Sequence, residues 1–379
     1  MALIEKLNAI GDAIRAKTGG TDKLTLDQMP TEIEGIQTGS GSTEVEPIVL
    51  TGNQPYGCCG KIASAYINMY GDTITTTGLG DTQYMFQNFT CEEIPFDINY
   101  NNLASRNMTY MFYHCANLKE LPMINNARPT YFENLFCGCN QMRTIPESLG
   151  DNWDFSSTHS GTYYSSQGVF QDCYSLRKIP ENFLKNLYTG GSGSYYQPYT
   201  NLFRNCHALD EVVGLSGSST AAQTSGMFAG TTFENCNRLK KIVFATDDNG
   251  QPLVFKWKSQ TIDLTNRVGH AYSDAAIISY NSGITTDKKV TSKEEYDALK
   301  NDPDWYAVNY YWSRYNHDSA VETINSLPDT SAYLATAGGT NTIKFQGASG
   351  ELTDGGAINT LTEEEIAVAT AKGWTVSFT

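Results

Sequence analysis

The 379-residue chain is poor in positive charge and contains no long apolar run. It has 26 lysine and arginine residues against 41 aspartate and glutamate residues, a formal net charge of −15. Phosphate recognition needs a basic surface, so we expect no nucleic-acid partner. No stretch approaches the roughly 20 apolar residues of a membrane span, and the amino terminus is amphipathic rather than an apolar signal core. We therefore expect no membrane insertion, and synthesis in a host cytoplasm without a signal peptide.

Motifs of the common enzyme classes are also missing. There is no G-x-S-x-G elbow, P-loop, G-x-G-x-x-G loop or H-E-x-x-H metal motif. A cysteine–histidine dyad at Cys115 or Cys206 would need the two side chains to meet. The histidine is the adjacent residue in each case, and adjacent side chains point apart. Asp151, Asp154 and Asp172 lie near aromatic segments, which leaves glycan hydrolysis as a minority alternative. The sequence predicts a protein that is not an enzyme, with no catalytic residue, cofactor or metal.

One motif recurs through the middle of the chain. Its clearest copy reads Met-Phe-x-x-Cys-x-x-Leu-x-x-Leu-Pro at residues 111–122. Six copies are centred on Phe86, Phe112, Phe136, Phe170, Phe203 and Phe233, which are 26, 24, 34, 33 and 30 residues apart. Such periods are typical of solenoids, whose coils stack equivalent side chains into columns. The Phe-to-Leu segment predicts a helical or 3₁₀ turn and Leu-x-x-Ile-Pro a short strand, so we expect a curved α/β solenoid.

Most of the cysteines follow from this repeat. Five of the nine hold the same motif position: Cys115, Cys139, Cys173, Cys206 and Cys236. Equivalent residues of stacked coils lie about 5 Å apart with parallel Cβ directions, which suits a disulfide poorly. We expect reduced thiols in the core. The other four form no zinc pattern with a histidine: Cys58, Cys59, Cys91 and Cys137.

Residues 1–38 predict a separate helical segment. Its apolar positions recur at helical spacing: Leu3, Leu7, Ile10 and Ile14, then Leu26, Met29 and Ile33. Two interpretations stay open, packing on the same chain or burial against another subunit. The stripe is too short to fix an oligomeric state. Residues 39–46 lie in a Gly/Ser-rich stretch that predicts a flexible linker.

The remaining ranges complete the predicted solenoid. Residues 47–80 predict a β-rich amino-terminal cap, 81–245 the repeats, and 246–379 a carboxyl-terminal extension and cap. Within the last range we expect strands at 253–257, 261–264, 342–345 and 374–378, and helices at 318–327 and 362–372. An aromatic cluster at residues 305–315 predicts either core packing or a second aromatic surface.

Two insertions between repeats are rich in tyrosine, serine and glycine, the composition of evolved binding loops. Their aromatic residues are the candidate ligand contacts: Trp153, Tyr163, Tyr164, Tyr188, Tyr195, Tyr196 and Tyr199. Aromatic faces suit sugar C–H groups as well as proteins. The alternative is that these tyrosines merely complete surface loops.

Two resemblances add to this interpretation. LIEKLNAI at residues 3–10, DAIRAKT at 12–18 and L-x-x-M-P-x-x-I at 26–33 resemble the amino-terminal module of tail proteins from phages and prophages of Gram-positive gut bacteria. The closing segment at residues 361–376 is similar to repeat proteins of the same phage group. The repeats resemble BspA-type leucine-rich repeats, although long insertions make their coils unequal in length.

These resemblances imply a virion tail fibre or receptor-binding protein. Its partners would be a bacterial surface receptor, either glycan or protein, other tail proteins contacted by residues 1–38, and further copies of itself, a trimer being common in tail fibres. Alternatives are a structural or decorative virion protein, a glycan-hydrolysing tail protein and a bacterial surface adhesin. The last is weakened by the missing export signal.

Overall fold

The computed structural model describes residues 48–54, 74–101, 106–154, 166–187, 198–217, 226–265, 315–346 and 361–379, together with the backbone of short segments between residues 276 and 353. The chain divides into two compact units, Met1–Ile48 and Val49–Thr379. Apart from Ile48, every described residue belongs to the second unit. The helices predicted in residues 1–38 and the linker at 39–46 lie outside the described residues, so these predictions stay untested.

The second unit begins with a two-stranded sheet of β1 (Ile48–Gly52) and β2 (Ile74–Leu79). Residues of β2 alternate between buried and exposed at its start, as a strand with one face on a core requires. The Thr76 hydroxyl accepts a hydrogen bond from the Asn99 backbone amide at 2.7 Å, and this bond joins β2 to the first coil. The β-rich structure predicted for residues 47–80 is confirmed for these two strands.

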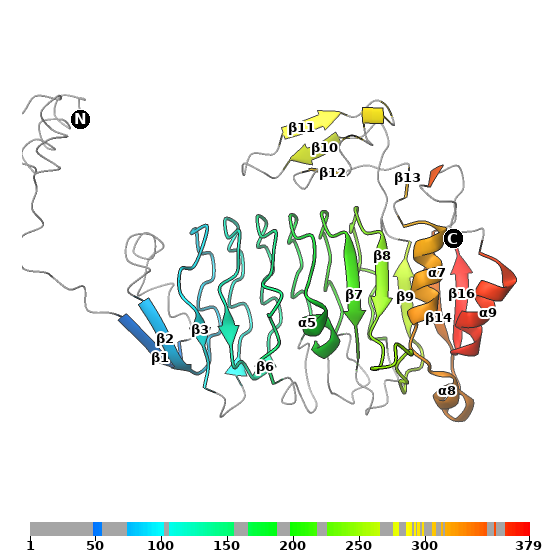
Figure 1. The fold of residues 1–379 in the computed structure, drawn as a ribbon, viewed down its shortest axis with the longest axis horizontal. Coiled ribbons are helices and arrows are strands. Elements are labelled where there is room, and N and C mark those ends of the chain that lie inside the picture. Colours follow the sequence, from blue (N-terminus) through cyan, green and yellow to red (C-terminus); the bar gives the residue numbers. More distant parts are fainter. Residues whose placement is uncertain are drawn as a thin grey trace, which may run out of the picture. The chain divides into compact units, whose positions relative to one another are not determined.

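Consecutive repeats pair in parallel through short strands (Figure 1). The pairs are β3 (Ile98–Asn99) with β5 (Ile124–Asn125), β4 (Arg106–Asn107) with β6 (Pro129–Tyr131), and β7 (Glu211–Leu215) with β8 (Lys241–Phe244). The strands β7 and β8 contain Val212 and Ile242, the aliphatic positions of their motif copies. The strand predicted at this point of the motif is therefore confirmed for these two copies, but it is wrong at Ile94, Leu121, Ile145 and Ile179, which lie outside any strand. A six-residue helix, α5 (Glu181–Asn186), follows the fourth copy.

The segment between the motif Phe and Leu is a chain of turns with i→i+3 hydrogen bonds, so a turn is found where a helical or 3₁₀ turn was predicted, but no helix forms. Alternate amides serve different partners. The Cys115 amide bonds back to Phe112 at 3.1 Å, whereas the His114 amide donates to the Cys137 carbonyl of the next coil at 2.8 Å. A continuous helix would use all these amides internally and leave neighbouring coils unlinked. The turns thus extend the parallel ladder across this face.

The motif phenylalanines form one buried column. Phe112 stacks on Phe86 with ring centroids 5.3 Å apart and on Phe136 at 5.6 Å. The stack continues from Phe136 to Phe170, Phe203 and Phe233 at 5.6, 6.2 and 5.5 Å. Burying a phenylalanine contributes about 1.5–3 kcal/mol, and an aromatic pair roughly 0.5–1.5 kcal/mol beyond that. The column is therefore a main source of cohesion between coils.

A three-stranded parallel sheet follows the repeats, with β14 (Asn341–Phe345) between β9 (Thr261–Leu264) and β16 (Trp374–Phe378). The helices are α7 (His317–Ser326), α8 (Ser331–Ala337) and α9 (Glu363–Ala371). The strands predicted at 261–264, 342–345 and 374–378 and the helices at 318–327 and 362–372 are confirmed within a residue or so. Thr362 and Glu365 form the predicted capping box.

The strand predicted at residues 253–257 is wrong. The segment contains isolated bridge residues, among them Val254, which pairs with Asp329, but it forms no ladder. Its Phe255 amide donates to the Asp329 carbonyl at 2.9 Å, in the connection that follows α7, so no neighbouring strand is available for a ladder. The two aromatic residues of the segment still enter the core, where the Phe255 and Trp257 rings stack at 4.5 Å.

Helix α7 occupies the edge of β8 where a further strand would otherwise pair. Ser319 Oγ donates to the Lys240 carbonyl at 2.6 Å and Thr323 Oγ1 to the Ile242 carbonyl at 2.7 Å. One turn further on, Ser326 Oγ accepts from the Phe244 amide at 3.0 Å. Positions spaced by four and three lie on one helix face, so α7 replaces strand partners with hydroxyls. An unpaired edge would invite association with another chain.

Candidate functional site

The repeat cysteines are structural. Each thiol lies against the carbonyl of the motif Phe one coil earlier: Cys115 to Phe86 at 2.9 Å, Cys139 to Phe112 at 3.3 Å, Cys173 to Phe136 at 3.1 Å, Cys206 to Phe170 at 3.0 Å and Cys236 to Phe203 at 3.1 Å. All seven described cysteines are buried and free, which confirms the prediction of reduced core thiols for the five of the repeat. Burial raises the pKa of Cys206, which is the wrong direction for a nucleophile.

Two of the seven predicted ligand contacts are wrong. Trp153 is 8% exposed and donates its indole N–H to the Ile124 carbonyl at 2.8 Å. Tyr199 is fully buried and bonds to the Ser216 carbonyl. Both stand at an end of their insertion, where the chain rejoins the coils and the ring enters the core. The other five lie outside the described residues: Tyr163, Tyr164, Tyr188, Tyr195 and Tyr196.

The predicted attachment residues also lie outside the described part of the chain: Leu3, Leu7, Ile10, Ile14, Leu26, Met29 and Ile33. Of the aromatic cluster at 305–315, Tyr315 is 1% exposed, so core packing is confirmed for that residue.

The three aspartates considered for hydrolysis each make a structural contact. Asp151 accepts from Asn182 at 2.8 Å, and Asp154 pairs with Arg128 at 2.9 Å. Asp172 accepts from Asn205 of the next coil at 2.6 Å, and Asn205 in turn accepts from Asn235 at 2.7 Å. These contacts form part of a polar ladder between coils.

Two positions of the turns have a left-handed backbone in the first five copies of the motif, and one of them does in the sixth. Two residues before the motif Phe stand Tyr84, Tyr110, Asn134, Gly168 and Asn201, with φ between 52° and 61°. Two residues after it stand Asn88, His114, Gly138, Asp172, Asn205 and Asn235, with φ between 58° and 79°. Glycine, asparagine and aspartate tolerate this conformation, whereas other side chains lose roughly 1–2 kcal/mol in it. Tyr84 and Tyr110 depart from that preference, whereas His114, the third ring at these positions, belongs to a residue type that adopts this conformation more often than most.

These three rings and the ring of Tyr113 form one surface group. We call it the turn-face aromatic cluster, and it consists of Tyr84, Tyr110, Tyr113 and His114. Tyr84 and Tyr110 are parallel, with centroids 5.0 Å apart and planes 2° apart. Tyr113 meets Tyr110 edge-on at 5.0 Å and stacks on His114 at 4.0 Å. The tyrosines are partly exposed and His114 is exposed. Gly138 leaves room for it, since a Cβ there would collide with the His114 ring.

The surroundings of the cluster disfavour added negative charge. Burial raises the pKa of Glu133, whose Oε2 accepts from Thr109 at 2.8 Å beside Tyr110. The pKa of Tyr113 is raised first by burial and then by Cys137, Tyr110 and Asp172. In both cases the neutral form is favoured. Beyond burial, the charge of Asp172 raises the pKa of Tyr113, so this side of the cluster suits a neutral or positively charged ligand better than an anion.

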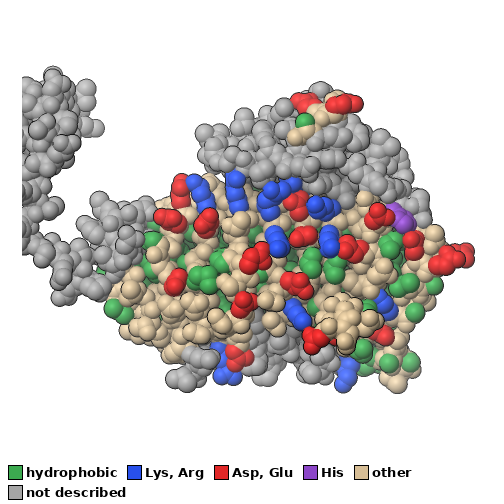
Figure 2. Space-filling view, in the orientation of Figure 1, with side chains coloured by type: hydrophobic (Ala, Val, Ile, Leu, Met, Phe, Trp, Pro, Cys, Tyr) green, Lys and Arg blue, Asp and Glu red, His purple; other side chains and the backbone are tan. Residues whose placement is uncertain are grey.

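Charged side chains elsewhere on the coils pair from one coil to the next. Figure 2 shows basic and acidic residues interspersed on one face of the repeats. Examples are Lys119 with Glu92 at 2.7 Å, Lys178 with Glu147 at 3.0 Å and Arg177 with Asp210 at 2.9 Å. Exposed pairs contribute little stability, but they neutralise the basic residues locally.

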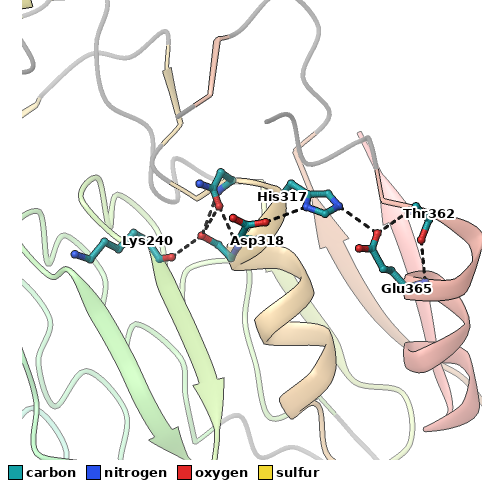
Figure 3. A network of polar contacts seen from close by, with 7 residues as sticks. Lys240, His317, Asp318, Thr362 and Glu365 are labelled. Carbon is teal, nitrogen blue, oxygen red and sulfur yellow. Dashed lines mark hydrogen bonds and ion pairs between the residues drawn. The ribbon is translucent and has the colours of Figure 1, made fainter. Parts of the chain in front are cut away.

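A group of polar side chains joins helices α7 and α9. Figure 3 shows His317 between Asp318 of its own helix and Glu365 of α9. Its Nδ1 lies 3.3 Å from Asp318 and its Nε2 lies 3.2 Å from Glu365. Glu365 also accepts from the Thr362 amide at 2.7 Å, which completes the cap of α9. The group links α7 to α9, and its side chains contact one another.

Within the described ranges, no three His, Cys, Asp or Glu residues are grouped so that they could hold a metal ion. The helices of that same part of the chain are too short or too polar to cross a membrane. Comparison of the chain with protein-family models, with curated proteins and with solved structures gives no match in any of the three.

The sequence contained a signal for the cluster that the search for tyrosine-rich insertions passed over. The residue before each motif Cys is mostly Asn, Asp or Gly, which is typical of a left-handed backbone. The residue two before the motif Phe is Asn or Gly at three copies, so Tyr84 and Tyr110 are exceptions that the sequence shows. His114 is a weaker signal, since histidine adopts this conformation more often than most residues.

Proposed function

We propose that the chain is a virion tail protein that recognises a receptor on a bacterial surface. In this proposal residues 81–245 form a solenoid of the BspA leucine-rich-repeat type. Residues 1–38 dock on other tail proteins or on further copies of the chain. The turn-face aromatic cluster, together with the tyrosine-rich insertions, contacts the receptor.

The observation that carries the proposal is the placement of the cluster. Rings stand at three backbone positions where this chain elsewhere uses Asn, Gly or Asp. Departures from local backbone preference are enriched at functional sites, because a binding requirement can outweigh a small loss of stability. Tyrosine also contributes large contact area with few torsions to order on binding.

The buried thiols and the paired aspartates support a recognition role over chemistry. The thiols have raised pKa values from burial, and each of the three candidate aspartates holds a neighbouring segment. Glycan hydrolysis is left without a favoured residue pair.

One observation favours a second candidate, a structural or decorative virion protein. Trp153 and Tyr199, each at an end of its insertion, serve the core rather than a ligand. The two candidates differ in cell binding, which only the recognition role requires.

The test is binding of the purified, fluorescently labelled full-length chain to a panel of Gram-positive gut bacteria. The proposal predicts saturable binding to at least one strain and competition by unlabelled chain. Virions carrying the chain should lose adsorption to that strain when excess free chain is present. Absence of saturable binding across the panel, with virions adsorbing normally in its presence, would contradict the proposal and leave the structural role.

A further inference from the structure

We infer that the turn-face aromatic cluster is a binding site for a neutral carbohydrate, which lies against the exposed parts of Tyr84, Tyr110 and His114. The inference rests on the proposed recognition function and adds the class of ligand. It places the site on the turns of the first coils, outside the tyrosine-rich insertions.

The backbone does not need these rings. Asparagine serves the same position as Tyr84 and Tyr110 at Asn134 and Asn201, and the same position as His114 at Asn205. The core does not need them either, because Phe86 and Phe112 already fill it and are fully buried. A requirement beyond folding is therefore the simplest reason for keeping rings in a left-handed backbone.

The shape and chemistry of the cluster fit a sugar. The face of an aromatic ring is electron-rich and attracts the polarised C–H groups of a pyranose. A hydrogen-bonding residue stands alongside. Asn88 donates its backbone N–H to the Tyr113 carbonyl at 2.8 Å, and the residue is exposed. Rings flanked by amides can contact both the C–H face and the hydroxyls of one ligand.

The surroundings favour a carbohydrate over a protein. The exposed large aliphatic or phenylalanine side chains of the described residues are Val49, Val254, Val368 and Phe378, none of them in the turns of the first coils. A protein interface normally has an apolar centre with a polar rim. Here polar residues border the rings, among them Asn88, Glu133 and Asp172, and a neutral ligand avoids repulsion from the Asp172 carboxylate.

The experiment uses the full-length chain and two variants. Tyr84→Asn/Tyr110→Asn removes two rings and inserts the residue that the chain itself uses at this position. Asn201→Gly is the matched control, because it changes a left-handed residue of the same column without removing a ring. Binding is measured on untreated, periodate-oxidised and protease-treated cells, and on immobilised cellohexaose, mannohexaose and hexagalacturonate. Thermal unfolding is recorded for every chain.

We expect wild-type binding to be lost after periodate and kept after protease. The double variant should bind at least about tenfold more weakly, with an unfolding midpoint within about 3 °C of wild type. Asn201→Gly should bind as wild type does. On the panel, a neutral hexasaccharide should be preferred to hexagalacturonate.

Several results would overturn the inference while leaving the proposed function intact. These are equal cell binding by the double variant, loss of cell binding after protease but not periodate, and preference for hexagalacturonate. Cluster-dependent binding to a neutral hexasaccharide without binding to any cell would support the inference and contradict the proposed function. A wild-type chain that binds neither cells nor saccharides would contradict both.

Discussion

The Sγ atom of Cys206 lies 3.0 Å from the carbonyl oxygen of Phe170, one coil earlier in the repeat. The same carbonyl accepts from the Cys173 amide at 3.2 Å, so the thiol is its second donor. Because the contact recurs at five coils, the cysteine column links neighbouring turns as well as filling space.

Cys206→Ala should therefore lower the free energy of unfolding by about 1–2 kcal/mol, through a small cavity and a lost donor. Cys206→Ser keeps a donor and should lose less. Urea unfolding of both variants measures the difference. An alanine variant as stable as wild type, or a serine variant less stable than the alanine variant, would show that the thiol contact contributes nothing to the free energy of unfolding.

Stability should fall at alkaline pH. Burial raises the pKa of Cys137 to about 12, and it also raises the pKa of Cys139, Cys173, Cys206 and Cys236. Above the ordinary value of 9.0 the unfolded chain releases these protons while the folded chain retains them. Each thiol then removes about 1.4 kcal/mol of stability per pH unit, whereas below that value it has no effect.

Urea midpoints between pH 7 and 10.5 check this prediction. Cys206→Ser is the control, because it removes one titrating group and should flatten the alkaline slope by about one thiol's share. A midpoint that is constant up to pH 10.5 would be inconsistent with buried neutral thiols.

The hydroxyls of α7 that bond to the edge of β8 should stabilise the end of the repeat region. Thr323→Val keeps the side-chain shape but leaves the buried Ile242 carbonyl without its 2.7 Å donor and removes one contact of the Tyr315 hydroxyl. We expect a loss of about 1–3 kcal/mol. Thr336→Val is the matched control, since Thr336 is exposed on α8 and should change stability by less than about 0.5 kcal/mol. Equal effects of the two variants in urea unfolding would refute the edge-closing role of α7.

The link between α7 and α9 should depend on pH. Hydrogen bonding to Asp318 and Glu365 raises the pKa of His317 above its ordinary 6.5. Its contribution is therefore complete below pH 6.5 and lost as the pH rises through the folded value. The pKa of Glu365 is lowered from 4.5, chiefly by the Thr362 amide, so its contribution is lost only as the pH falls through the lowered value.

The link should thus be strongest between pH 4.5 and 6.5. Amide hydrogen exchange of α9 at pH 6 and pH 8 measures it, with intrinsic exchange rates corrected for pH. His317→Gln should abolish the difference in protection between the two conditions. Protection that changes with pH identically in wild type and variant would assign the effect to another group.

Sequence patterns anticipated the features that depend on local spacing. The Phe and Cys columns follow from a fixed interval, and α9 follows from Thr362 and Glu365 three residues apart. The left-handed residues of the turns were not predicted, because apolar residues at every third position fit a helix as well as such a turn. Trp153 and Tyr199 were misassigned because the burial of a loop aromatic depends on contacts distant in sequence.

The most direct measurement is the free energy of unfolding of Tyr110→Asn compared with Phe112→Ala, two residues away in the same coil. Relief of the left-handed backbone, about 1–2 kcal/mol, should roughly offset the lost ring contacts at Tyr110, so that the variant stays within about 1 kcal/mol of wild type. Phe112→Ala should lose about 3–5 kcal/mol. A loss of that size at Tyr110 would mean that its ring serves packing, and would contradict its assignment to a ligand.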